Sequence, residues 1–281
     1  SVGLKDVRNE MRLLPEQGRL DSDRWFGACV VPMAMTYGRP AEGGSLQTQL
    51  LYGEAVFLLD REDGFFLVHA GDGYLGWVRE NCILPMSRQQ FRDYTQFPEA
   101  VLLEDMATDN GRMVRNSRLR ITGAENGLLH ILLPDGRRER IDRSKARRID
   151  NSVPGMARAR AALTLLHVPY LFAGKSSVGL DCSGLVGTTS DAYGCVLPRD
   201  AAQQFVSGSL VATRWYREGL RPGDRIYFLN GTGKIFHTGL SLGGRHFVHS
   251  SPPGVQINSL QEGDRLYRES WDRQFLGARR P

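Results

Sequence analysis

Apolar residues follow one pattern before Asp150 and another after it, and this change limits the chain to a mixed architecture. In the first part, residues 47–63 and 64–84 form short runs of β-branched, aromatic and aliphatic residues that Asp-Gly turns interrupt. Residues 117–142 repeat the same order of strand, glycine turn, strand, Asp-Gly turn and strand. The spacing predicts two small β-barrels of about 50–60 residues each, joined by a helical or irregular connector over residues 85–100.

Beyond Asp150 the pattern predicts helices followed by strands. Residues 153–170 place Pro154 near a helix start and then carry apolar residues at helical spacing. A second helix is predicted over residues 182–193, and four strands are predicted after it, at 224–230, 235–244, 245–251 and 254–260. Helices first and an antiparallel meander second indicate an α+β fold class.

The length of 281 residues suggests two or three domains, and the hydropathy pattern predicts no transmembrane helix. The longest uncharged stretches, such as residues 25–38, are shorter than the about 18 apolar residues that a spanning helix needs. The formal net charge is 36 − 31 = +5, and much of it lies in residues 137–148. Glu139 and Asp142 interrupt this run and no aromatic residue in it can stack on bases, so we expect a solvated basic face and no nucleic-acid partner.

Four cysteines are too few for a disulfide scaffold, and no Cys-x-x-Cys pair suggests a zinc ribbon. Cys29 and Cys82 could form a disulfide in an oxidising compartment, although two inert buried thiols are the simpler interpretation. The chain begins at Ser1 without an initiator Met, which slightly favours a processed, exported chain over a cytoplasmic one.

One cysteine stands at a predicted helix start. Asp181 is a good N-cap residue, the helix follows from Cys182, and Gly194 suits the position after its end. In the first turn, unpaired backbone N–H groups and the helix dipole favour a thiolate, which predicts a lowered thiol pKa. Cys182 is therefore either a nucleophile or a buried structural thiol, and position alone does not decide between them.

A cysteine nucleophile needs a base, and the base needs a third group that fixes its ring. His237 and His249 lie 249 − 237 = 12 residues apart on neighbouring predicted strands, so antiparallel pairing can bring their imidazoles together. His246 is an odd number of residues from His249 and should point the other way. The alternative is a metal site built from Cys182 and the two histidines, but no fourth ligand is evident.

The motifs around these residues resemble the papain-like NlpC-type cell-wall cysteine peptidases. They are PYLFAGKSSVGLDCSGLV, LPRDAAQQF, RPGDRIYF, HTGLSL, FVHSS and FLGARR. The preceding β regions resemble bacterial SH3-like domains. The arrangement of two such domains before a catalytic domain is similar to that of the γ-D-glutamyl-L-diamino-acid endopeptidases. The resemblance implies four parts: an N-terminal extension (1–27), two SH3-like domains (28–87 and 99–149) and a papain-like peptidase domain (150–281).

The resemblance also implies roles for individual residues. Cys182 is then the nucleophile, His237 the base and His249 the residue that orients the base. The substrate-site residues that it implies are Tyr170, Asp181, Ser183 and Arg199 near the thiol and Tyr74 from the first SH3-like domain.

Four of these five substrate-site residues also have a purely structural interpretation. Asp181 could only cap the helix, and Ser183 could only occupy its first turn. Arg199 could only form an ion pair with Asp200, and Tyr74 could be a barrel aromatic.

Two positions depart from the family pattern. Phe172 and Ala173 stand where the family usually has Trp-Gly. An acid that the resemblance implies before residues 48–54 has no clear counterpart, since Ser45 occupies that place with Glu42 and Glu54 nearby.

The function that the resemblance implies is hydrolysis of the γ-D-Glu–diamino acid bond in cell-wall (murein) stem peptides by a cysteine endopeptidase. If Tyr74 closes one end of the groove, a short dead end remains beside the thiol, and its carboxylate and hydroxyls come from Asp181, Tyr170 and Ser183. These groups suit a free ammonium group, which predicts a requirement for a free N-terminal L-Ala. We expect no metal or organic cofactor, a peptidoglycan-derived peptide substrate, wall contact through the SH3-like domains and a monomer. A secreted, periplasmic or envelope location is slightly favoured over the cytoplasm. The alternatives are an acyltransferase or amidase with the same triad and a non-catalytic wall-binding protein.

Overall fold

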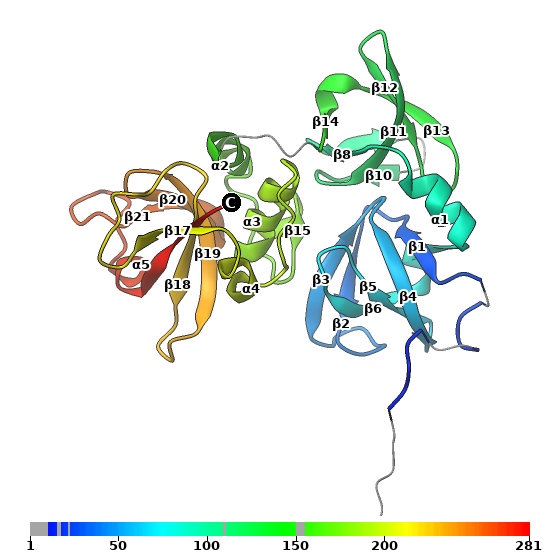
Figure 1. Ribbon diagram of the computed structural model, residues 1–281, viewed down its shortest axis with the longest axis horizontal. Helices are drawn as coiled ribbons and strands as arrows, with labels where there is room; N and C mark the ends of the chain where they lie inside the picture. The colour runs from blue at the N-terminus through cyan, green and yellow to red at the C-terminus, as the bar shows by residue number, and fades with distance from the viewer. Residues whose placement is uncertain (1–10, 16–17, 22, 109–110, 150–154) are drawn as a thin grey trace, which may run out of the picture.

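The computed structural model describes residues 11–15, 18–21, 23–108, 111–149 and 155–281, which form three larger β-sheets and a few helices. We call these sheets the N-terminal sheet (β1–β7), the middle sheet (β8 and β11–β14) and the C-terminal sheet (β17–β22). Figure 1 shows the first two on one side of the molecule and the C-terminal part on the other. Helix α3 (Cys182–Asp191) and the short strand β15 (Lys175–Ser176) lie on the side of the C-terminal part that faces the other two sheets.

Seven antiparallel strands form the N-terminal sheet in the order β3-β2-β6-β5-β4-β1-β7. Their bounds are Phe26–Cys29 (β1), Met33–Tyr37 (β2), Leu46–Leu51 (β3), Ala55–Glu62 (β4), Phe65–His69 (β5), Leu75–Arg79 (β6) and Ile83–Met86 (β7), with the 3-10 helix Glu80–Cys82 (η1) before β7. Successive side chains point to opposite faces, so Val56 and Leu58 are buried in the core while Phe57 between them is 46% exposed. Gly64 and Gly73 have φ values of 79° and 86° in the predicted Asp-Gly turns, a conformation that glycine adopts without strain.

The middle sheet has five antiparallel strands in the order β13-β12-β11-β8-β14. The elements here are Glu99–Leu102 (β8), Arg118–Glu125 (β11), Leu128–Leu132 (β12), Arg138–Asp142 (β13), Arg143–Lys145 (η2), Ala146–Arg148 (β14) and a separate hairpin, Met106–Thr108 (β9) and Gly111–Met113 (β10). The predicted connector contains helix α1 (Arg88–Thr95). The side chains of Ser87 and Gln90 each accept a hydrogen bond from the other's backbone amide, which fixes the start of this helix. Both β regions are antiparallel sheets as the sequence predicts, and their closure into barrels stays a prediction.

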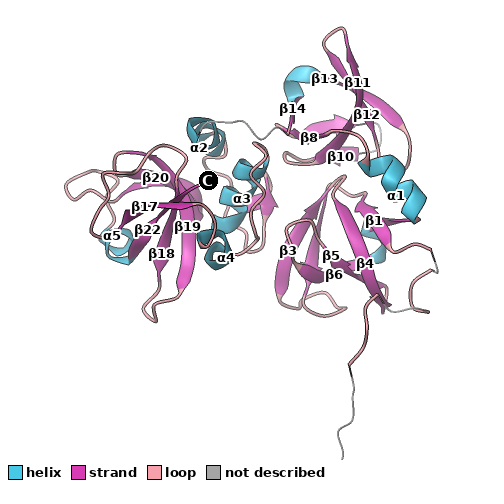
Figure 2. Cartoon of the chain, in the orientation of Figure 1, coloured by secondary structure: helices cyan, strands magenta, loops and turns pink. Residues whose placement is uncertain are grey.

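The C-terminal part confirms the predicted α+β order of helices followed by an antiparallel sheet. Its helices are Gly155–Leu163 (α2), α3, Ala201–Phe205 (α4) and Glu269–Gln274 (α5), and Figure 2 shows them gathered in this part of the molecule. The sheet order is β17-β22-β18-β19-β20-β21, with bounds Ser209–Thr213 (β17), Arg225–Leu229 (β18), Ile235–Gly243 (β19), His246–Ser251 (β20), Gly254–Ser259 (β21) and Phe275–Arg280 (β22); β15 pairs with Gly179–Leu180 (β16). Leu185 and Val186 of α3 pack with Leu240 and Val248 of the sheet, so apolar burial holds the helix against β19 and β20.

Some predictions about the ends of elements differ from the structure or lie beyond its description. Phe26 and Gly27, predicted as the end of an N-terminal extension, belong to β1, and Leu20 is already buried in the core of the N-terminal sheet. Pro154 lies outside the described part of the chain, and so does residue 150, where the peptidase domain is predicted to begin. None of the described helices is long and apolar enough to cross a membrane.

All four cysteines are free, so the alternative of a disulfide between Cys29 and Cys82 is wrong. Cys29 is fully buried in the core of the N-terminal sheet, and burial raises the pKa of its thiol far above the ordinary value. The simpler interpretation of an inert buried thiol therefore fits Cys29. Cys82 is only half-buried, although burial raises the pKa of its thiol as well.

Candidate active site

Cys182 begins helix α3, as the sequence predicts. Asp181 is the N-cap with an extended backbone, and its Oδ1 accepts a hydrogen bond of 2.7 Å from the amide of Gly184. The thiol lies beside β19, where the backbone amide of Thr238 interacts with the sulfur. The helix start therefore brings the thiol next to the strand that carries His237.

The thiol of Cys182 does not have the lowered pKa that the sequence predicts. Burial is the largest influence and the negative charge of Asp181 adds to it, so the pKa of Cys182 rises to about 11. The backbone amides of Thr238 and Ser183 and the charge of Arg199 act in the opposite direction but are weaker. The prediction fails because a helix start favours a thiolate only where burial does not outweigh it, and Cys182 is only 9% exposed.

The two histidines meet across neighbouring strands. His237 lies on β19 and His249 on β20, and the Nε2 of His237 is 2.7 Å from the Nδ1 of His249. A Cβ atom on Gly239 would lie only 2.7 Å from the carbonyl oxygen of Val248 and 3.0 Å from the Cβ of His249, so glycine lets the two strands approach closely here. His246 instead has its Nε2 2.9 Å from a carboxylate oxygen of Asp264. The predicted juxtaposition of the two imidazoles is confirmed.

A fourth polar residue, Asn258 on β21, extends this chain of hydrogen bonds. Its Oδ1 is 2.8 Å from the Nε2 of His249, and its Nδ2 donates to the carbonyl oxygen of Leu266 at 3.2 Å. Because the amide nitrogen is used on Leu266, the amide oxygen faces His249 and can only accept, so the proton of His249 sits on Nε2. The Nδ1 of His249 then accepts from the Nε2–H of His237, which leaves the Nδ1 of His237 unprotonated.

Burial keeps both imidazoles neutral. Desolvation, and secondly the neighbouring His249, hold the pKa of His237 well below 6.5. Desolvation lowers the pKa of His249 to about 4, although the hydrogen bond with Asn258 acts in the opposite direction. Trp271 of α5 stacks on the His237 ring, with centroids 4.5 Å apart and planes inclined by 23°. A neutral imidazole held by Trp271 can act as a base.

Beside the thiol, Asp181 is fully occupied by other protein groups. Arg199 donates to both of its carboxylate oxygens, at 3.0 and 2.6 Å, and the amide of Ala173 donates to Oδ2 at 2.8 Å. The Ser183 hydroxyl donates to Oδ1 at 3.2 Å and accepts from Arg199 at 2.7 Å. The structure brings these three predicted residues together as a buried cluster (Asp181, Ser183 and Arg199). Arg199 pairs with Asp181 and not with Asp200, so the ion pair weighed in the sequence has a different partner.

The two predicted tyrosines come from different regions of the chain. Tyr170 is half-buried beside the thiol, and burial first, then the charges of Cys182 and Asp181, raise the pKa of its hydroxyl. Tyr74 reaches across from the N-terminal sheet, and its hydroxyl donates a 2.5 Å hydrogen bond to Asp200. Asp200 is a functional candidate that sequence reasoning missed, although the LPRDAAQQF motif contains it.

The positions that depart from the family pattern have defined places. Phe172 is 61% exposed, and Ala173 is buried with a φ of 64°, where glycine would be unstrained. Glu42 forms an ion pair with Arg79 and Glu54 one with Lys175, so neither stands free to replace the implied acid near Ser45.

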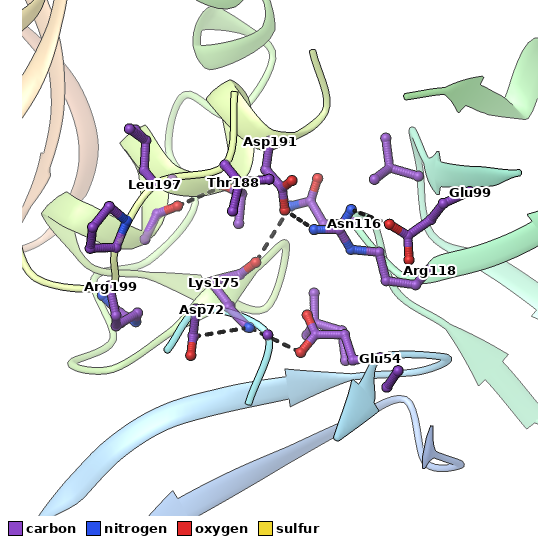
Figure 3. A pocket seen from close by; sticks show the side chains of 18 of the residues that line it. Glu54, Asp72, Glu99, Asn116, Arg118, Lys175, Thr188, Asp191, Leu197 and Arg199 are labelled. Atoms are coloured by element: carbon purple, nitrogen blue, oxygen red, sulfur yellow. Dashed lines mark hydrogen bonds and ion pairs between the residues drawn. The ribbon is translucent and has the colours of Figure 1, made fainter. Parts of the chain in front are cut away.

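A pocket of about 270 Å³ lies where the three sheet regions meet (Figure 3). Among the residues that line it are Glu54 and Asp72 of the N-terminal sheet region, Arg118 of the middle sheet, and Lys175 and Asp191 of the C-terminal part. Arg118 and Asp191 form an ion pair across it. Cys182 does not line this pocket, so the pocket marks the junction of the regions and not the place of the thiol.

Among the described residues, no group of three or more His, Cys, Asp or Glu side chains is arranged to hold a metal ion. The facing nitrogens of His237 and His249 are hydrogen-bonded to each other. The alternative of a metal site at Cys182 and the two histidines therefore has no support from the geometry.

Two stretches of the chain match known family models. Residues 167–280 match the NlpC/P60 family, and this stretch includes Cys182, His237 and His249. Residues 36–83, within the N-terminal sheet, match the bacterial dipeptidyl-peptidase SH3 domain. The N-terminal region thus contains an SH3-like domain, and the second such domain stays a prediction.

Curated relatives have peptidase names. The gamma-D-glutamyl-L-lysine dipeptidyl-peptidase of Bacillus cereus is 27% identical over 84% of this chain and 75% of its own. The probable endopeptidase NlpC of Escherichia coli is 33% identical over 47% of this chain and 82% of its own. A crystal structure of an NlpC/P60 family protein from Bacillus cereus shares the fold, with a TM-score of 0.76 at 22% identity over 91% of this chain and 99% of that one. This chain is a cysteine peptidase, and it belongs to the NlpC/P60 family.

Proposed function

We propose that this peptidase hydrolyses the γ-D-Glu–diamino acid bond of cell-wall stem peptides and requires a free N-terminal L-Ala. Cys182 is the nucleophile, His237 the base and His249 the group that orients the base. The observation that carries this assignment is the 2.7 Å contact between the Nε2 of His237 and the Nδ1 of His249. This contact uses the Nε2 of His237, so the lone pair on its Nδ1 remains free to accept the thiol proton of Cys182.

The reaction starts from a neutral thiol and a neutral imidazole, because the pKa of Cys182 is raised and that of His237 is lowered. His237 removes the thiol proton as the sulfur attacks the side-chain carbonyl of γ-linked D-Glu. Backbone N–H groups at the start of α3 stabilise the oxyanion that forms. The imidazolium then gives its proton to the leaving amine of the diamino acid. A water molecule, deprotonated by His237, hydrolyses the acyl-enzyme and restores the thiol.

The proposed selectivity for a free amine depends on Asp200. Arg199 already neutralises Asp181, so Asp181 offers little net charge to a substrate ammonium group. The Asp200 carboxylate accepts a hydrogen bond from the hydroxyl of Tyr74, and a charge-assisted hydrogen bond from the L-Ala ammonium to this carboxylate would be strong. An acyl group or glycan on that amine would remove the charge and collide with Tyr74.

The relatives support this proposal by name. Two are gamma-D-glutamyl-L-lysine dipeptidyl-peptidases, from Bacillus cereus and Bacillus subtilis. A dipeptidyl-peptidase releases two residues from a free amino end, which agrees with a cleft that is closed beyond the second residue before the scissile bond.

Mass spectrometry of a muropeptide mixture before and after incubation tests the proposal. We expect release of L-Ala-γ-D-Glu from peptides with a free L-Ala, and no change in peptides still attached to the glycan. Cleavage at another bond, transfer to an acceptor other than water, or binding without any product would each refute the proposed reaction.

A further inference from the structure

A lysine of the C-terminal part is buried against the N-terminal sheet. Lys175 on β15 is 8% exposed, and its Nζ lies 3.0 Å from Glu54 and 3.2 Å from Asp72. Its backbone amide donates to the side chain of Gln49 at 3.1 Å. Figure 3 shows the ammonium group between the two carboxylates. A charge is tolerated at such a place only with partners, so the two carboxylates hold β15 against this sheet.

Asp72 connects this lysine to Tyr74. One oxygen of Asp72 accepts from Lys175 and, at 2.6 Å, from the Thr48 hydroxyl. The other oxygen accepts from the backbone amide of Tyr74 at 3.2 Å. The carboxylate therefore joins the C-terminal part to the backbone of the residue that closes the cleft.

The turn that carries Tyr74 is closed by two backbone hydrogen bonds, from the Ala70 amide to the Tyr74 carbonyl oxygen at 2.9 Å and from the Gly73 amide to the Ala70 carbonyl oxygen at 3.0 Å. It contains Gly71 and Gly73, and neither would have another heavy atom within 4 Å of an added Cβ. Because glycines allow the backbone many conformations, the anchored Asp72 carboxylate inside the turn adds to these two bonds in fixing the place of Tyr74. Its hydroxyl end is held by Asp200 and its backbone end by Asp72.

We propose that the Lys175–Asp72 ion pair is the link that positions Tyr74 to close one end of the substrate cleft. This inference rests on the proposed requirement for a free N-terminal amine. Lys175 touches no reacting atom and is a positioning residue. The ion pair affects which peptides bind, while the chemistry at Cys182 proceeds without it.

Two isosteric variants separate this link from general docking of the two parts. Asp72→Asn keeps an oxygen for the Tyr74 amide but turns its NH₂ group toward the Lys175 ammonium, so attraction is lost. Glu54→Gln is the matched control, because it removes the other carboxylate partner of Lys175 and leaves the connection to Tyr74 intact. Lys175→Met removes both pairs, and Lys175→Arg restores the charge.

The readouts are kinetic and structural. For each variant, kcat and KM are measured with the tripeptide L-Ala-γ-D-Glu-diamino acid and with its N-acetylated form. We expect Asp72→Asn and Lys175→Met to lower the preference for the free tripeptide about tenfold, mainly through KM, as loss of one charged hydrogen bond does. Glu54→Gln and Lys175→Arg should retain the preference to within about twofold. Hydrogen–deuterium exchange at the Tyr74 amide should accelerate in Asp72→Asn and Lys175→Met only.

Each other outcome overturns the inference. An unchanged preference or unchanged Tyr74 exchange in Asp72→Asn would show that the ion pair does not position Tyr74. An equal loss in Glu54→Gln would assign the effect to docking in general. If Lys175→Met does not fold, Asp72→Asn decides the matter alone. A wild-type enzyme without any preference for the free tripeptide would refute the proposed amine requirement itself. A preference that the wild type and all the variants share would instead refute only the role of the ion pair.

Discussion

The hydroxyl of Tyr74 donates a 2.5 Å hydrogen bond to Asp200, a residue 126 positions further along the chain. The contact brings a side chain of the SH3-like domain to the loop before α4, within the NlpC/P60 region. Burial, and secondly the hydrogen bond to Asp200, raise the pKa of Tyr74, so the hydroxyl stays protonated and remains a donor. In the proposed function, substrate selection therefore depends on both regions.

Removing only this hydroxyl should weaken binding of the free tripeptide. In Tyr74→Phe the ring remains and Asp200 loses its partner, so we expect KM to rise about tenfold with little change in kcat. Steady-state kinetics on free and N-acetylated tripeptides measure the effect. A fall in kcat for both substrates would instead connect Tyr74 to the chemistry.

The two histidines should contribute unequally. His237→Ala removes the base, whereas His249→Ala leaves the base present but poorly oriented. In another triad enzyme the third member mattered less than the base by about two powers of ten, so we expect His237→Ala to be nearly inactive and His249→Ala to be impaired but measurable. Single-turnover rates on the free tripeptide test the order. The reverse order would exchange the two roles.

Asn258 should determine the pH at which the base works. Asn258→Asp introduces a carboxylate next to His249, which favours the protonated imidazoles and raises their pKa. Because the base must be neutral, the acidic limb of kcat/KM should move to higher pH in this variant. In the wild type that limb should lie below pH 6.5, since burial and His249 lower the pKa of His237. A profile that is the same in both proteins would mean that Asn258 does not act on the histidine pair.

The raised thiol pKa predicts slow alkylation at neutral pH. With the pKa of Cys182 at about 11, the rate of inactivation by iodoacetamide should rise about tenfold for each pH unit between 7 and 10. A rate that is constant across this range would indicate a thiolate already formed by His237, contrary to the neutral pair described above.

The Asp181–Arg199 pair should be essential for stability. Arg199→Met leaves a buried carboxylate unpaired, which costs about 3–5 kcal/mol in typical cases, so thermal unfolding should shift to markedly lower temperature. The matched control is Asp181→Asn combined with Arg199→Met, where a neutral amide can still cap α3. This double variant should be more stable than Arg199→Met alone, and equal stability would mean that the unpaired charge is not the cause.

The sequence predicted the parts of the site that depend on local pattern. Strand alternation placed His237 and His249 together, and the residue before Cys182 indicated the helix start. Asn258 and Trp271 were missed because each lies on a later element whose packing against the histidines depends on tertiary contacts.

Burial and partner choice also could not be predicted from the sequence. The thiol pKa follows from how deeply α3 packs, and the partner of Arg199 follows from the fold of the loop before α4. Asp200 stands next to Arg199 in the chain, yet it faces Tyr74, because adjacent side chains in an extended segment point in different directions.

The most direct test of the account is to find the acyl group on the enzyme. The tripeptide L-Ala-γ-D-Glu-diamino acid is mixed with the enzyme and quenched in acid during turnover, and the digested protein is mapped by mass spectrometry, with Cys182→Ala treated in parallel. The account predicts an L-Ala-γ-D-Glu thioester on the peptide that contains Cys182, and no hydrolysis by Cys182→Ala. Hydrolysis by Cys182→Ala, or an acyl group on Cys29, Cys82 or Cys195, would contradict it.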